Sequence, residues 1–149
     1  MRVIRYLSRL VITDGKIYNE WCDEDKTILR MVFEGDWSWM QCFWYLMRAG
    51  VIQMRNKNFC AMIYDLTDSG PLPVGQWMVG KFDWIWNPDL WPETMIRIVV
   101  IGGGAQMDEI FAIRKQVSPK SMPFFKRADT LDEALHLIDT WDEDKQNVV

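Results

Sequence analysis

The sequence predicts a single α/β domain, a mixed sheet of four to five strands with about four helices packed on it. Short apolar runs typical of strands alternate with segments whose apolar residues recur every three or four positions, as on one face of a helix. The length of 149 residues is the usual size of one domain, and the 49% hydrophobic content supplies a sizeable core. We therefore expect one domain over residues 17–141, an N-terminal arm or edge strand over 1–16, and a polar tail over 142–149.

The first half of the domain begins with two short strand-like runs, residues 17–21 and 28–33, separated by an acidic turn. We expect these two strands to pair antiparallel. Asp36 then precedes a helix expected over 37–49 and is its predicted cap, because a carboxylate can accept hydrogen bonds from the free N–H groups of a first turn. Residues 59–64 form a near-continuous apolar run, which is typical of a central strand covered on both faces.

The second half continues the same alternation. Thr130 and Glu133 have the spacing of a capping box, which marks the start of the last helix. The connections are long enough for right-handed crossovers, so at least part of the sheet is expected to be parallel. The expected elements are, in order, a helix over 74–86, a strand over 95–101, a helix after three glycines, a short strand at 124–125 and a helix over 131–141.

Composition and charge argue against several classes of function. The formal net charge is −4 with Lys and Arg scattered along the chain, a pattern that does not favour nucleic-acid binding. No run reaches the roughly 18 to 20 apolar residues of a membrane span, and arginines interrupt the apolar N-terminal stretch, unlike a signal peptide. Cys22, Cys42 and Cys60 have no metal-binding spacing and resemble reduced thiols, so a cytoplasmic protein is expected.

Four short motifs accompany this order of elements: GDWSW after the second strand, IYDLTDSG at the third, VVIGGG at the fourth and ADTLDEAL near the end. Together they resemble the STAS/SpoIIAA-like superfamily over residues 17–141, and in particular small stand-alone bacterial SpoIIAA-like proteins. The resemblance implies a mixed sheet with helices packed on it and a role in binding rather than turnover.

Ser69 is a candidate regulatory site. In anti-sigma-factor antagonists of this superfamily, a Ser or Thr preceded by Asp at the start of the second helix is phosphorylated, and Asp68-Ser69-Gly70 is the segment here that aligns with that motif. A phosphate at a helix N-terminus would be favoured by the helix dipole. The alternative is a turn or capping serine, since Asp, Ser, Gly and Pro are the residues of an ordinary turn.

Gly102, Gly103 and Gly104 lie between a predicted strand and a predicted helix, where backbone N–H groups can approach an anion. They form a candidate anion loop. The run lacks the full spacing of a dinucleotide-binding or P-loop motif, and the alternative is a tight turn.

The sequence disfavours catalysis. Asp65, Asp68 and Asp89 are candidate carboxylates for binding or for acid-base chemistry, but no spacing fixes them to one site. The only histidine, His136, has no catalytic partner at a recognisable spacing. We therefore expect no enzymatic activity, no metal and no cofactor.

Nine tryptophans are present, and Trp77, Trp84, Trp86 and Trp91 lie on or just after the helix expected over 74–86. One face of that helix can pack on the sheet. The surplus rings are then expected on the surface, where an apolar patch usually marks an interface with a partner or a second copy. The alternative is a thick core that absorbs all of them.

The sequence thus predicts a non-catalytic interaction or regulatory module. It would present residues 68–74 and the aromatic helix to a protein partner or to its own copy, most simply as a homodimer. A second hypothesis is a binder of a small apolar, lipid-like ligand enclosed beneath that helix. An enzyme would require a polar pocket with a strongly perturbed carboxylate near Asp65.

Overall fold

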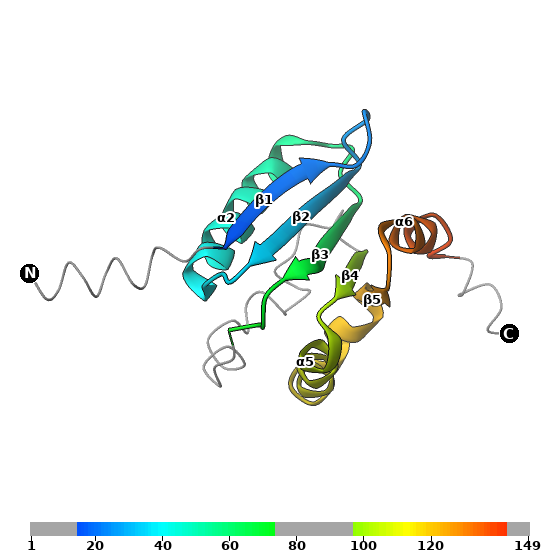
Figure 1. Cartoon of the computed structure of the whole chain (residues 1–149). Coiled ribbons are helices and arrows are strands. Elements are labelled where there is room, and N and C mark those ends of the chain that lie inside the picture. Colours follow the sequence, from blue (N-terminus) through cyan, green and yellow to red (C-terminus); the bar gives the residue numbers. More distant parts are fainter. Residues whose placement is uncertain (1–14, 74–96, 143–149) are drawn as a thin grey trace, which may run out of the picture.

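The computed structural model describes residues 15–73 and 97–142, which form an α/β domain around one five-stranded sheet (Figure 1). The strands lie side by side in chain order, β1 antiparallel to β2 and each later strand parallel to the one before. The predicted α/β class, the mixed sheet and the antiparallel first pair are confirmed. The strands are β1 (Lys16–Trp21), β2 (Ile28–Gly35), β3 (Ala61–Ser69), β4 (Ile98–Gly102) and β5 (Phe125–Ala128).

Helix α2 (Trp39–Arg55) follows β2 and is longer than predicted. Its N-cap is Ser38, which accepts from the Gln41 backbone N–H while the Gln41 side chain accepts from the Ser38 N–H. The prediction that Asp36 caps this helix was therefore wrong. The helix also continues past residue 49, because Ile52 packs on the core and the buried Gln53 amide donates to Met62 Sδ.

The other helices within the described residues are α5 (Gly104–Val117), the 3₁₀ helix η2 (Pro119–Phe124) and α6 (Leu131–Asp139). Thr130 caps α6 as predicted, accepting from the Glu133 N–H. The Glu133 carboxylate accepts from the N–H of Asp129, one residue before the cap, instead of closing the box on Thr130. None of the described helices has the length and hydropathy needed to cross a membrane.

Strand β3 differs most from its prediction. It was expected to end at Tyr64, with Asp68 and Ser69 in the loop that follows, but pairing with β2 continues to the register Gly35 opposite Ser69. Between the pairs Val32–Asp65 and Glu34–Asp68, two residues of β3 lie opposite one residue of β2, so β3 contains a bulge at this point. Asp68 and Ser69 are thus part of the sheet, and the connecting segment begins at Gly70.

Hydrophobic side chains fill both sides of the sheet. On one face they pack with α2 and α5, in a cluster that includes Leu29, Met62 and Ile98. On the other face Ile63 and Val99 pack under α6. This two-sided burial confirms that the run at 59–64 marks a central strand. Helix α6 contacts β3, β4 and β5 (Figure 1). Over β1 and β2 the same face carries polar contacts of Tyr18, Glu20 and Arg30.

Several predictions fall outside the described residues. These are the helix over 74–86, most of the arm over 1–16, the tail beyond residue 142, and the side chains of Trp77, Trp84, Trp86, Asp89 and Trp91.

Candidate functional site

Ser69 lies at the end of β3, where its hydroxyl is engaged twice. It accepts from the indole Nε1 of Trp37 at 2.7 Å and donates to the Gly70 carbonyl at 2.8 Å. Trp37 is buried, with its ring against Phe33 at a centroid distance of 4.8 Å. The serine therefore ties the start of α2 to the end of β3. Phosphorylation of Ser69 stays a prediction.

The segment after Ser69 is held by two further contacts. Gln106 of α5 accepts from the Leu72 N–H at 2.8 Å and donates to the Leu72 carbonyl at 3.3 Å. The Trp39 indole donates to the Pro73 carbonyl. The described part of the predicted 68–74 surface is thus fastened to the N-terminal ends of both α2 and α5.

The three glycines after β4 form a tight turn. Gly102, Gly103 and Gly104 all have positive φ, between 51° and 84°. A Cβ on Gly103 would lie 2.7 Å from Cβ of Met107, so a side chain there would also clash. The turn geometry explains the glycines by itself, and anion binding at this loop stays a prediction of the sequence.

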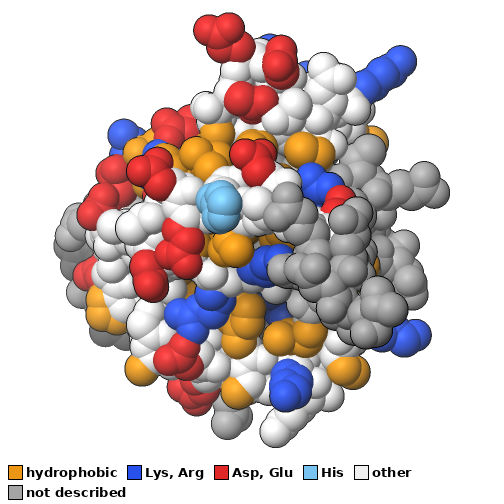
Figure 2. All heavy atoms as spheres, turned by 90° about the vertical axis from the view of Figure 1, so that its right-hand side faces the viewer, with side chains coloured by type: hydrophobic (Ala, Val, Ile, Leu, Met, Phe, Trp, Pro, Cys, Tyr) orange, Lys and Arg blue, Asp and Glu red, His pale blue; other side chains and the backbone are white. Residues whose placement is uncertain are grey.

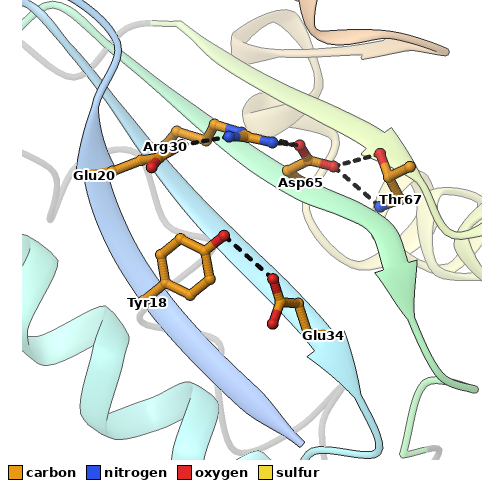
Figure 3. Close-up of polar contacts among 6 residues, drawn as sticks. All are labelled: Tyr18, Glu20, Arg30, Glu34, Asp65 and Thr67. Carbon is orange, nitrogen blue, oxygen red and sulfur yellow. Dashed lines mark hydrogen bonds and ion pairs between the residues drawn. The ribbon is translucent and has the colours of Figure 1, made fainter.

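Asp65 is the centre of a polar network on the α6 side of the sheet, in the part over β1 and β2 that α6 does not cover, which we call the open half of the sheet (Figure 3). One carboxylate oxygen accepts from Arg30 Nε at 2.9 Å and from Arg30 Nη2, and the other accepts from Thr67 N at 3.0 Å and Thr67 Oγ1 at 2.5 Å. Arg30 also contacts Glu20 of β1. Although Asp65 is only 3% exposed, both of its oxygens are fully hydrogen-bonded.

The electrostatics of Asp65 follow from these contacts. Burial raises the pKa of the carboxyl, but the hydrogen bonds from Thr67 and Arg30 outweigh it, and the pKa is lowered overall. Asp65 therefore remains a carboxylate at neutral pH, with no acceptor position left for a metal ion or substrate. Its geometry is that of a structural ion pair joining three strands. Asp65 is therefore not the perturbed carboxylate that the enzyme hypothesis requires.

Asp68, by contrast, is exposed, and its register position is opposite Glu34 of β2. Glu34 accepts from the Tyr18 hydroxyl at 3.3 Å (Figure 3). Within residues 15–73 and 97–142, no group of three or more His, Cys, Asp or Glu side chains is placed to hold a metal ion.

The surface feature that the sequence analysis missed is on α2. Of the six large hydrophobic residues that are exposed in the described part of the chain, five lie on this helix and the sixth is Val117 of α5. We call the five the outer stripe: Met40 (50% exposed), Trp44 (62%), Met47 (46%), Val51 (47%) and Met54 (82%).

The outer stripe lies on the side of α2 that faces away from the sheet, since the core-facing side buries Cys42, Ala49 and Gln53. Helix α2 is at the left of Figure 1 and is turned away from the viewer in Figure 2. The face shown in Figure 2, which carries α6, has charged side chains of both signs between small separate hydrophobic groups. The continuous row on α2 differs from this ordinary surface.

A signal for the outer stripe was present in the sequence. Its members are spaced four, three, four and three residues apart, which is one seam of a helix, and a second apolar seam of the same helix enters the core. A helix with two apolar seams has one more than a single sheet can cover.

Comparison with known proteins gives no match to a family model, to a curated protein or to a solved structure.

Proposed function

We propose that the protein is a non-catalytic interaction module of the STAS/SpoIIAA-like type, and that it binds a protein partner through the outer stripe of α2. The observation that carries the proposal is the placement of five exposed, uncharged, large side chains in one row on a single helix. An apolar surface of this kind on a folded domain usually marks an interface, because its burial removes apolar area from water.

The chemistry of the row favours a protein surface as the ligand. Three of the five residues are methionines, whose flexible thioether side chains adapt to irregular surfaces, and Trp44 is the type of residue that anchors interfaces. The polar network at Asp65 supports the non-catalytic part of the proposal, because all hydrogen-bonding positions of its carboxylate are used within the chain and the carboxylate is held in its charged form. Free cysteines at three described positions support the proposed cytoplasmic location.

Regulation through Ser69 completes the proposal. A phosphate on Ser69 would remove the hydroxyl proton donated to Gly70 and would crowd the bond to the Trp37 indole. It would also place negative charge beside Asp36, whose Oδ1 is within 2.2 Å of where a Cβ on Gly70 would lie. Like-charge repulsion would then loosen the connection at the start of α2, next to the outer stripe.

The test is site-specific photocrosslinking in cells of the source organism. A photoreactive phenylalanine analogue replaces Met47 in the outer stripe or, as the control, Val117 on α5; the two native side chains are 46% and 45% exposed. We expect protein adducts from position 47 and few from position 117. Equal or absent adducts at the two positions would contradict the proposed function.

A further inference from the structure

Resting on the proposed function, we infer that the partner of the outer stripe is a second copy of the chain, and that two α2 helices pair antiparallel about a two-fold axis through Met47.

The first argument is the spacing of the row. Steps of four, three, four and three residues from Met40 to Met54 are the alternating steps of a heptad seam, the pattern with which one helix packs along another. The seam spans 15 residues, and its ends are about 21 Å apart at 1.5 Å rise per residue. Helix α2 spans 17 residues, so nearly its whole length carries the seam. A ligand that fits this surface is therefore itself long, straight and apolar, as a second α2 is.

The second argument is that the seam is complementary to itself. Met47 is its central member, and a two-fold axis there brings Met40 of one copy level with Met54 of the second copy. Helix α2 contains no Asp or Glu, so no carboxylates are forced together across the axis. Its near-axis cation, Arg48, is one turn from Trp44 and lies on the same edge of the seam. Its guanidinium lies over the ring of Tyr45 on the same helix, 5.6 Å from the ring centroid, so an intrachain cation–π contact already holds this charge beside the seam.

The third argument is area. From their exposed fractions, the five side chains present on the order of 500 Å² of accessible surface per copy, since an aromatic side chain alone can bury ~150–250 Å². Two copies would bury on the order of 1,000 Å² from the seam alone, which reaches the lower limit for a specific interface, and the flanking polar residues add to it. The patch is thus large enough to hold a dimer without any other element.

The test combines solution mass with residue-level oxidation. As the chain concentration is raised from low micromolar to submillimolar, the molar mass measured by light scattering is expected to rise from the monomer value of 17.7 kDa toward twice that value. In parallel, brief peroxide treatment followed by mass spectrometry reports how fast Met40, Met47 and Met54 become sulfoxides. We expect their oxidation to slow as the mass rises. Protection that does not depend on concentration would assign the seam to a segment of the same chain and overturn the inference.

A charge exchange on the axis identifies the partner. Met47→Glu and Met47→Lys each place like charges opposite each other in the pair and are expected to stay monomeric, while their equimolar mixture regains the dimer mass. Met47 is 46% exposed, so both variants should fold, which circular dichroism checks. Val117→Glu, at 45% exposure, is the matched control and should leave the mass unchanged. Failure of the mixture to associate overturns pairing about Met47.

The two proposals fail separately. If the chain is monomeric at every concentration but position 47 forms adducts with a different protein, the proposal that α2 pairs with a second copy is overturned. The proposal that the protein is an interaction module then still holds. Flotation with vesicles of phosphatidylcholine and phosphatidylglycerol, abolished by Met47→Glu, would assign the seam to a lipid surface and overturn both. Absence of adducts together with a monomeric mass also overturns both.

Discussion

Breaking the ion pair between Arg30 and Asp65 is expected to destabilise the domain strongly. The pair joins β2 to β3 on the open half of the sheet, and Asp65 also binds Thr67. Removing one partner of a buried pair costs about 3–5 kcal/mol. The Arg30 side chain is 22% exposed and keeps its contact with Glu20, so Asp65→Ala is expected to cost somewhat less than a fully buried pair, about 2–3 kcal/mol.

That loss is a large share of the roughly 5–15 kcal/mol by which domains of this size are usually stable. Urea unfolding followed by circular dichroism measures it. Arg30→Met is the second arm of a double-mutant cycle, because its linear apolar side chain keeps much of the arginine's packing while removing its charge. The double variant should lose less stability than the sum of the singles, by about 1–3 kcal/mol. If the unfolding free energy of Asp65→Ala is within about 0.5 kcal/mol of the wild-type value, or if the losses of the two single variants simply add, the ion pair does not stabilise the sheet as argued.

The same carboxylate gives the domain an acid dependence. Because the pKa of Asp65 is lowered in the folded chain, its contribution is fully present above the unfolded pKa of about 3.9 and is lost as the pH falls through the folded value. Between about pH 5 and pH 2 the melting temperature of the wild type should therefore fall more steeply than that of Asp65→Asn. Parallel curves would show that Asp65 titrates alike in both states.

Three further predictions concern local structure. Ser38→Ala removes the N-cap of α2 and should lower the unfolding free energy by about 1 kcal/mol, which thermal melts will detect. Gly103→Ala places a Cβ against Met107 at a residue with positive φ and should destabilise the domain by about 1–3 kcal/mol. Gly50→Ala adds a Cβ in open space within a helix and should stabilise the domain by up to about 1 kcal/mol. A Gly103→Ala variant that resists urea better than Gly50→Ala would refute this. Burial raises the pKa of Cys42 to about 12, so a thiol reagent should label it only on unfolding, and labelling in native buffer would refute its burial.

The strands were predictable where burial alone determines them. Leu29, Ile63 and Val99 are apolar because the sheet is covered there, and β-branched and aliphatic runs between turn residues indicate this without any knowledge of the partners. Thr130 was likewise predictable as a cap, because capping depends on residues within one turn of each other.

The end of β3 was not predictable in this way. Asp65, Asp68 and Ser69 have the composition of a turn, and only distant residues show that they belong to a strand. Arg30 satisfies the buried carboxylate from 35 positions away, and Trp37 satisfies the serine from 32 positions away. Local patterns carry no information about such pairing, which is why the predicted strand was too short.

The outer stripe was hidden for a different reason. Trp44 and Met47 have the same three-residue spacing as Ala49 and Ile52, which belong to or pack against the core. Periodicity identifies an apolar seam but does not say which of two seams meets the sheet. That choice depends on how α2 is oriented on the sheet, and its start is held by the Ser38 cap and by the hydrogen bond between Trp37 and Ser69, which lies 32 positions away.

The order of the strands has a consequence for how the chain acquires its structure. Among the described strands, each one after β1 pairs with the described strand that precedes it, so every added strand uses an edge that already exists. Only the β1–β2 hairpin closes a short loop; the parallel pairs, such as Ile28 with Ala61 and Met62 with Ile98, join distant residues and therefore form more slowly. During synthesis, the hairpin of β1 and β2 can form first and receive the remaining units one at a time as they emerge from the ribosome.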